Sequence, residues 1–230
     1  MTKIIPDTAK MTAVGRLAGG VAHDYNNILG AIEGYASLVS ASLKPGEQMR
    51  QDLDEIRKAV SRGSAFSRLL FIFSLKNPPP DQASSAAAAA ESLRGEETAL
   101  AALGIKLVLE VSPDLPQVAG SQEQLNLAMA HLLSNARDAM PGGGEARVSA
   151  ALKDGLVELA VSDTGAGVPQ EAQPFIFEPF FTTKEKGKGK GLGLTLVYGI
   201  ARLRGGRVEA ETETGKGSRF AMLLPPARKT

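Results

Sequence analysis

The chain has 230 residues, which suits one or two domains, and 43% of them are hydrophobic, so wholesale disorder is excluded. Its 26 basic and 25 acidic residues leave a formal charge of +1, which gives no electrostatic basis for a nucleic-acid partner. The absence of cysteine and the presence of only two histidines exclude disulfides, thiol nucleophiles, zinc–thiolate sites and multi-histidine metal cages. The sequence shows neither a signal-peptide pattern nor an apolar run of membrane-spanning length. We therefore expect a cytoplasmic protein without direct membrane insertion.

The N-terminal part of the chain predicts two long helices. Apolar residues recur in alternating steps of three and four over four heptads, at Met11, Val14, Ala18, Val21, Tyr25, Ile28, Ile32, Tyr35 and Val39. Pro45 and Gly46 interrupt this pattern. A second helix is expected over about 49–73, with a stripe at Leu53, Ile56, Val60, Phe66, Leu70 and Phe73. A second copy of the chain is the simplest cover for so wide an apolar face, which predicts a homodimer through a four-helix bundle.

The remainder predicts a second domain, because helices and strands alternate there. Three consecutive prolines, Pro78 to Pro80, stop the second helix and make a short, stiff linker. The alanine-rich segment 84–103 predicts a helix, although a low-complexity linker is an alternative. Further helices are expected over 122–140 and 192–203, and strands over 105–111, 146–152, 156–162, 207–212 and 218–224. The fold class is therefore α+β: a helical hairpin over 1–76, a linker over 77–82, and an α/β sandwich with a mixed sheet over 83–230.

His23 is the first candidate for chemistry. The heptad places it at the most solvent-exposed position, with Asp24 next to it and Asn27 one turn further on the same face. Gly19 and Gly20 precede it and cost about 1 kcal/mol each relative to alanine in a helix, which favours close approach by another molecule. A lone exposed histidine is usually only a solvated residue. An imidazole beside a carboxylate also fits a nucleophile with its base.

Three other segments carry polar or glycine-rich patterns. Asp163, Gly165 and Gly167 follow an apolar strand, and a run of glycines and lysines over 187–194 opens a helix. Backbone N–H groups at such a helix start suit phosphate, but a flexible surface loop explains the glycines equally well. Asn135 is polar within an apolar helical segment. It either bonds locally or supplies an oxygen ligand to Mg²⁺.

Taken together, these segments resemble the catalytic core of two-component sensor histidine kinases over about residues 10–225. The matching segments are, in chain order, the H box (19–27), the N box (131–139), the first glycine box (163–167), the F box (177–184), the second glycine box (187–194) and a closing glycine motif (215–220). The resemblance implies a dimerisation and histidine phosphotransfer domain, followed by a catalytic ATP-binding domain of the Bergerat type.

The resemblance also implies a role for each matching residue. His23 would be the phosphoacceptor, Asp24 would polarise its imidazole, and Asn27 would orient water for dephosphorylating a response regulator. Asn135 would bind Mg²⁺ bridging the ATP phosphates, and Asp163 would accept a hydrogen bond from the adenine amine. The other implied ATP-binding positions are Gly165, Gly167, Thr183, Lys184, Gly187, Gly189, Gly191, Leu192 and Gly193. Position 131 is commonly asparagine in these kinases, so His131 is either a phosphate-side or proton-handling residue, or simply a buried histidine.

The primary interpretation is therefore an ATP- and Mg²⁺-dependent protein-histidine kinase. It would be phosphorylated on His23 and pass the phosphoryl group to an aspartate in a response regulator receiver domain. One alternative is a docking or phosphotransfer adaptor with an inactive ATP site. Another is an ATPase of the same nucleotide fold, although such relatives usually carry glutamate where His131 stands. Only about ten residues precede the first helix, so we expect a catalytic fragment or a kinase controlled by a partner protein.

Overall fold

The computed structural model describes the chain except residues 45–47, 75–81, 186–188, 190 and 228–230. Within the helices it does not describe the side chains at positions 8, 12–19, 62, 65–66 and 68–74. The chain divides into two compact units, one over Thr12–Leu75 and the other over Met1–Met11 together with Lys76–Thr230. The linker expected over 77–82 falls mostly outside the described residues.

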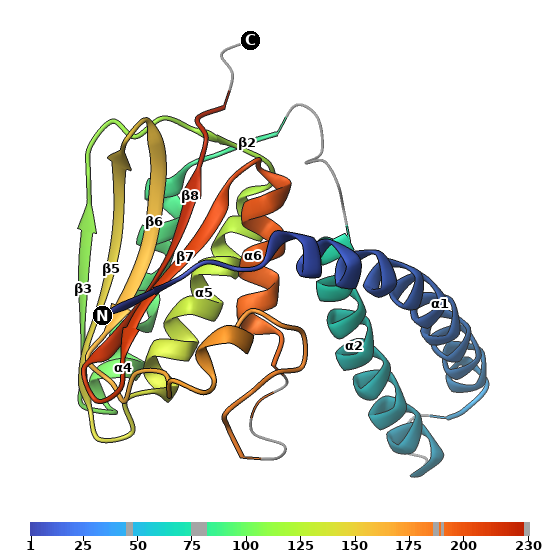
Figure 1. The fold of residues 1–230 in the computed structure, drawn as a ribbon. Helices are drawn as coiled ribbons and strands as arrows, with labels where there is room; N and C mark the ends of the chain where they lie inside the picture. Colours follow the sequence, from blue (N-terminus) through green and yellow to red (C-terminus); the bar gives the residue numbers. More distant parts are fainter. Residues whose placement is uncertain (45–47, 75–81, 186–188, 190, 228–230) are drawn as a thin grey trace. The chain divides into compact units, whose positions relative to one another are not determined.

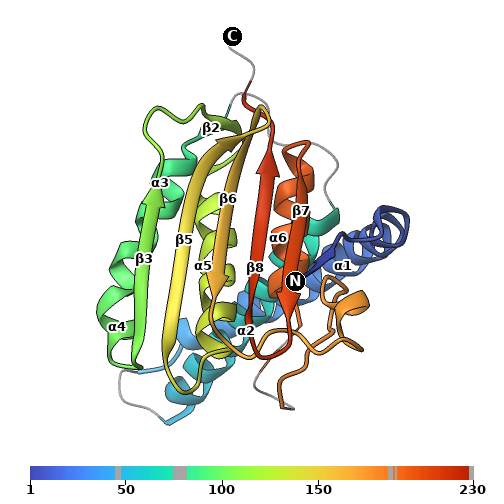
Figure 2. The same ribbon diagram turned by 60° about the vertical axis from the view of Figure 1, so that its left-hand side comes forward.

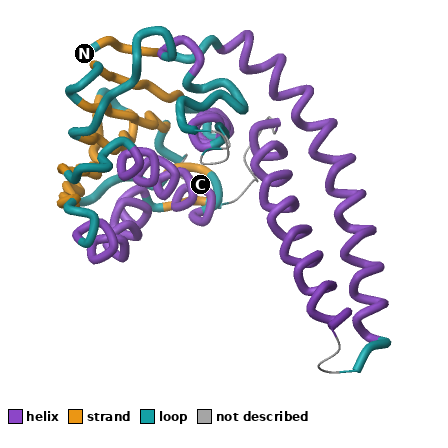
Figure 3. The backbone as a smooth tube through the Cα atoms, turned by 90° about the horizontal axis from the view of Figure 1, so that it is seen from below, coloured by secondary structure: helices purple, strands orange, loops and turns teal. Residues whose placement is uncertain are grey.

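The smaller unit is a helical hairpin. Helices α1 (Thr8–Ala41) and α2 (Gln48–Ser74) run side by side along their length (Figure 3). Their contact surface buries Ala22 and Ala36 on α1, fourteen residues apart, with the partly buried Leu29 midway between them. Leu53, Val60 and Ser67 form the matching buried row on α2.

The predicted apolar stripe of α1 is not the surface that packs within the hairpin. Six of its large members are exposed, whereas Met11 at its start is buried; the exposed ones are Val21, Tyr25, Ile28, Ile32, Tyr35 and Val39. On α2, Leu53 and Val60 are buried as expected, whereas Ile56 is exposed. The side chains of Val14, Ala18, Phe66, Leu70 and Phe73 lie outside the described residues. The single chain therefore leaves the predicted dimer face without a cover among the residues described.

The larger unit contains a six-stranded mixed sheet in the order β1-β7-β8-β6-β5-β3. Its main strands are β3 (Ile105–Val111), β5 (Gly144–Lys153), β6 (Leu156–Asp163), β7 (Arg207–Glu213) and β8 (Gly217–Leu224). Only the pair β3–β5 is parallel, and the other neighbouring pairs are antiparallel. Helices α3 (Ala86–Glu91), α5 (Gln122–Asp138) and α6 (Gly193–Leu203) cover one face (Figures 1 and 2). The predicted sandwich with a mixed sheet is confirmed.

The core lies between this sheet and the helices, because alternate strand residues point to the covered face. Leu159 of β6 and Met222 of β8 are fully buried, as are Leu125 and Met129 of α5 and Ile200 of α6. The predicted alanine-rich helix is divided into α3, a 3₁₀ turn over Ser92–Glu96 and α4 (Glu97–Ala101). A two-residue pair, β2 (Ala83–Ser84) with β4 (Val118–Ala119), completes the unit.

Residues 1–11 belong with the larger unit, although the sequence pattern grouped them with the helices. Strand β1 (Thr2–Ile4) pairs antiparallel with β7, where Lys3 lies opposite Glu211 and ion-pairs with Glu209 at 2.8 Å. Lys10 ion-pairs with Glu178 and lies over the ring of Phe175. The pairing is non-local, so a three-residue strand forms where the local sequence has no strand pattern.

Candidate functional site

Asp163 lies at the end of the central strand β6 and is only 7% exposed. Its Oδ1 accepts backbone hydrogen bonds from Gly165 at 2.9 Å and from Ser218 at 3.3 Å. Burial raises the pKa of this carboxyl, and the two backbone N–H donors oppose the rise. Among the described residues no hydrogen bond reaches Oδ2, so this oxygen is the acceptor that Asp163 offers to a ligand.

The glycines after Asp163 are required by the protein's own packing. A β-carbon on Gly165 would collide with the carbonyl oxygen of Ala139 at the end of α5, and one on Gly167 would collide with that of Glu213. The loop is held on its other side by the bond from Val168 N to Thr212 Oγ1, 2.9 Å long. Close approach of Gly165 and Gly167 to an adenine ring therefore stays a prediction.

Asn135 and His131 lie one turn apart on α5 and converge on the first residue of α6. A β-carbon placed on Gly193 would be 3.5 Å from His131 Nδ1 and 3.6 Å from Asn135 Nδ2. Burial lowers the pKa of His131, which keeps its imidazole neutral at pH 7. The first N–H groups of a helix have no partner within the helix, and the positive end of its dipole lies there, so the start of α6 suits an anionic group.

The F box and the second glycine box are joined by backbone contacts. Phe180 N donates to Gly191 O at 2.8 Å, and Thr195 Oγ1 donates to Phe177 O at 3.0 Å. Gly191 has a φ of +65°, and a β-carbon there would meet the backbone of Phe180 and Phe181. Gly191 is thus fixed by packing against the F box, with Leu192 buried beside it.

Lys184 ties this segment to α5. Its Nζ donates to Asp138 Oδ2 at 2.6 Å, and Arg137 pairs with the other oxygen at 2.9 Å. Burial alone would raise the pKa of Asp138, but the bonds and charges of Lys184 and Arg137 outweigh it and lower that pKa. Gly189 approaches Thr182 and Lys184, and Thr183 is exposed. Gly187 lies outside the described residues.

His23 belongs to the helical unit, and its side chain is 73% exposed. Both of its contacts are made by Nδ1, 3.3 Å from Asp24 Oδ1 and 3.5 Å from Asn27 Nδ2. The first contact needs a proton on Nδ1 and the second needs a lone pair there, so the two cannot form together. In the tautomer that bonds Asp24, Nε2 carries the lone pair and has no hydrogen-bond partner among the described residues.

Gly20, three residues before His23, has open space around it. A β-carbon there would meet nothing within 4 Å. Packing within this part of the chain therefore does not explain that glycine, and its close approach to another molecule stays a prediction. Gly19 lies among the residues whose side-chain environment is not described.

Comparison with known proteins shows similarity to histidine kinases. Residues 120–228 match the family of histidine kinase-, DNA gyrase B-, and HSP90-like ATPases. Sensor kinase CckA of Brucella abortus is 36% identical over 231 residues, which cover 94% of this chain and 24% of CckA. The chain is a homologue of sensor histidine kinases. Sensor histidine kinase ZraS of Escherichia coli is 29% identical over 217 residues, which cover 94% of this chain and 46% of ZraS.

Solved structures of histidine kinases share this fold. The mycobacterial sensor histidine kinase MprB is 27% identical, with a TM-score of 0.50 over 63% of this chain and 93% of its own. Full-length ShkA, solved with AMPPNP, has a TM-score of 0.68 over 93% of this chain and 46% of its own, at 23% identity. This histidine kinase homologue spans 24% of the length of CckA and 46% of the length of ZraS.

Two site residues of this histidine kinase homologue were missed by sequence reasoning. Ser218 supplies a backbone donor to Asp163, and Asp138 anchors Lys184. Both lie in segments that the resemblance covers, the closing glycine motif and the N box. Their partners are 55 and 46 residues away, so no local pattern could have assigned the contacts.

The side chains of α5 can be compared with the magnesium site that the resemblance implies. No cluster of three or more histidine, cysteine, aspartate or glutamate side chains suited to a metal occurs among the residues that the structure describes. Asn135 alone offers an amide oxygen at the start of α6, which fits an ion held mainly by phosphate oxygens and water. A search of the described residues finds no helix long and apolar enough to span a membrane.

Proposed function

We propose that this protein is an ATP-dependent protein-histidine kinase that is phosphorylated on His23. The observation that carries the proposal is the imidazole of His23, 73% exposed on α1, with Nδ1 at 3.3 Å from Asp24 Oδ1. The same chain carries an ATPase-family domain in which Asp163, Asn135 and the start of α6 offer groups suited to adenine, metal and phosphate. The helical unit would be the dimerisation and phosphotransfer domain, and the larger unit the catalytic domain.

The transfer step follows from this tautomer. The Nε2 lone pair attacks the γ-phosphorus of ATP, an N–P bond forms, and the P–O bond to ADP breaks with its electron pair leaving on ADP. Attack leaves a positive charge on the ring, which Asp24 removes by accepting the Nδ1 proton. Asn135 would hold Mg²⁺, which supplies neutralisation of phosphate charge when bound.

The phosphoryl group would pass next to an aspartate of a response regulator receiver domain. The relatives are named sensor kinases, and ThkA, a kinase of this fold at 19% identity, has been solved with the response regulator protein TrrA. The protein would act as a homodimer, because six large apolar side chains of the α1 stripe, between Val21 and Val39, are exposed in the single chain.

Labelling with ATP tests the kinase against its two alternatives. A base-stable, acid-labile label on the protein is expected, and His23→Gln should remove all of it. Asp24→Asn should leave nucleotide binding intact and slow labelling by about 10²–10⁴-fold, the range for a general acid–base partner. Free phosphate without protein label would support the ATPase instead, and no ATP use at all would support the adaptor.

Asn27 would have a separate role in dephosphorylating the response regulator. It lies one turn from His23 on the same exposed face, where its amide can orient a water molecule. Asn27→Ala should therefore keep labelling from ATP and lose the decay of phosphorylated response regulator that the kinase promotes. Loss of both activities together would assign Asn27 to supporting His23 instead.

A further inference from the structure

Ser67 on α2 makes a buried hydrogen bond to the backbone beside His23. Its side chain is 0% exposed, and its Oγ donates to the carbonyl oxygen of Ala22 at 2.9 Å. A serine inside a helix commonly bonds the carbonyl four residues earlier in its own helix, which would be that of Gly63. Here the hydroxyl reaches across the hairpin to α1, to a residue 45 positions away in the sequence.

The accepting carbonyl is part of the peptide unit that carries the N–H of His23. Because the peptide bond is planar, a bond to this oxygen also restrains the nitrogen and the Cα atom of His23. Helix geometry already directs the amide of Asn26 to the same carbonyl, and a carbonyl oxygen can accept two bonds. The Ser67 hydroxyl therefore adds a restraint from the second helix to one already present within α1.

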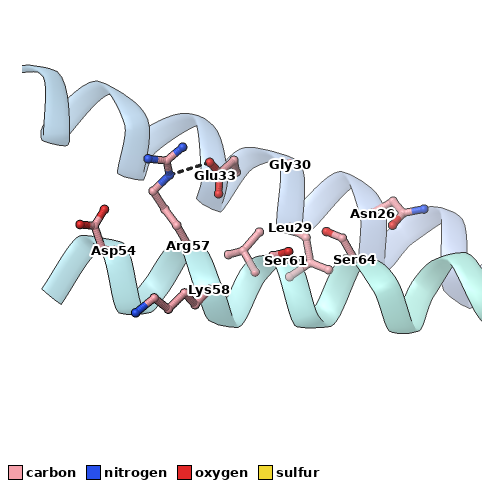
Figure 4. Close-up of a pocket in the computed structure, with 10 residues that line it drawn as sticks. Asn26, Leu29, Gly30, Glu33, Asp54, Arg57, Lys58, Ser61 and Ser64 are labelled. Atoms are coloured by element: carbon pink, nitrogen blue, oxygen red, sulfur yellow. Dashed lines mark hydrogen bonds and ion pairs between the residues drawn. The ribbon is translucent and has the colours of Figure 1, made fainter. Parts of the chain in front are cut away.

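The packing around this bond places the two helices close together. Ala22 is fully buried, so only a methyl group separates α1 from α2 at that position. One turn before Ser67, a β-carbon on Gly63 would lie 3.1 Å from Cδ1 of Leu29, so the missing side chain allows that contact. Beyond this contact, a groove of about 670 Å³ lies between the helices, and its lining includes the bonded pair Arg57 and Glu33 (Figure 4).

His23 has little else to fix its position. The two contacts of its ring are 3.3 and 3.5 Å long, exposed to solvent, and mutually exclusive. Gly20, Gly30 and Gly34 on the same helix have open space around them and add no packing restraint. In-line attack on a phosphoryl group depends on the placement of the nucleophile. The two weak ring contacts of His23 do not fix the position of its imidazole.

We propose that Ser67 is a positioning residue for phosphoryl transfer, acting through the Ala22 carbonyl to hold the backbone of His23. This role rests on the proposed function of His23 as phosphoacceptor. Ser67 is buried behind α1 and bonds only to backbone in this arrangement, so it touches neither the phosphate nor the imidazole. Its removal should therefore affect the rate of transfer and leave ATP binding unchanged.

The test compares four variants of the full chain. Ser67→Ala removes the hydroxyl, Ser67→Cys keeps the shape but is a poor donor, and Ser67→Thr keeps the donor. Ser61→Ala is the matched control, because Ser61 is an exposed serine of the same helix that lines the groove (Figure 4). Labelling from ATP gives kcat and KM, circular dichroism gives helix content, and phosphoramidate labels His23 chemically without the ATP-binding domain.

We expect Ser67→Ala and Ser67→Cys to lower kcat by about tenfold, with the KM for ATP and the phosphoramidate rate unchanged. Ser67→Thr should recover most of the rate, and Ser61→Ala should match the wild type. Wild-type kcat in Ser67→Ala and Ser67→Cys would overturn the proposal. Equal losses of helix content and of phosphoramidate labelling would also overturn it, by assigning Ser67 a structural role.

The proposed function fails in a different way. Absence of any ATP-derived label in the wild type, with normal phosphoramidate labelling, would refute the kinase and remove the transfer step that Ser67 is proposed to serve. A labelled wild type with an unaffected Ser67→Ala would refute the role of Ser67 alone.

Discussion

The exposed apolar stripe of α1 makes a quantitative prediction about association. Ile28 lies in the middle of the stripe and is 58% exposed in the single chain. Complete burial of an isoleucine side chain is worth about 1.5–3 kcal/mol, so covering the exposed part contributes about 1–2 kcal/mol in each protomer. In a symmetric dimer the same residue is buried twice.

Ile28→Asp removes this contribution and places two carboxylates in the interface. Each unpaired buried charge costs several kcal/mol, so the dissociation constant should rise by more than about a thousandfold. Tyr25 and Ile32, one turn to either side on the stripe, offer no cationic group to pair with the new carboxylates. The dimer should therefore separate at micromolar concentration.

Light scattering measures this directly. The wild type should give twice the chain mass of 24.0 kDa, and Ile28→Asp should give the chain mass itself. Ser37→Asp is the matched control, since Ser37 is an exposed residue on the same helix outside the stripe. A wild type that is monomeric at micromolar concentration, or an Ile28→Asp variant that still forms a dimer, would refute the reasoning.

Four further predictions concern the larger unit. Asn135→Ala should abolish Mg²⁺-dependent labelling while circular dichroism stays unchanged, and wild-type rates would rule out its metal role. Asp163→Asn should weaken ATP binding by calorimetry, because the amide keeps an oxygen for Gly165 and Ser218 but loses the charged acceptor. Burial raises the pKa of Asp163, so this carboxylate is protonated at a higher pH than an exposed aspartate. The ATP affinity of the wild type should therefore begin to fall at that higher pH as the solution is acidified. Deleting residues 2–5 removes the β1–β7 pairing and should lower the melting temperature of this unit by about 2–4 °C for each kcal/mol lost. An unchanged melting temperature would show that the pairing does not stabilise the unit.

The elements with strong local patterns could be predicted from the sequence. The helix expected over 122–140 forms as α5 and buries apolar residues at helical spacing, including Leu125, Met129 and Leu132. The strands on either side of the Asp154–Gly155 turn also form as expected, as β5 and β6. In each case the periodicity of apolar residues matches the geometry of the element and its burial.

Features that depend on distant partners could not be predicted. Strand β1 has three residues and forms only because β7 offers a free edge. The contact surface between α1 and α2 uses Ala22 and Ala36. These small residues give a weaker sequence pattern than the larger apolar side chains of the exposed stripe. The ion pair of Lys184 with Asp138 joins two segments whose proximity is set by the whole fold.

The glycines of the ATP-binding unit show how packing and ligand roles can be separated. Gly191 has a φ of +65°, and a β-carbon there would lie 2.6 Å from Phe181 O, so alanine is excluded by the protein itself. Gly193 differs, because a β-carbon there would have ordinary contacts at 3.5 Å or more with His131 and Asn135. Alanine also has a helix propensity about 1 kcal/mol more favourable than that of glycine. The melting temperature of Gly193→Ala should therefore be no lower than that of the wild type. Its methyl group would nevertheless occupy space between Asn135 and the start of α6, where the phosphates are proposed to bind. We therefore expect Gly193→Ala to weaken ATP binding without loss of stability, and Gly191→Ala to lower the melting temperature. Unchanged ATP affinity in a stable Gly193→Ala variant would place the phosphates elsewhere.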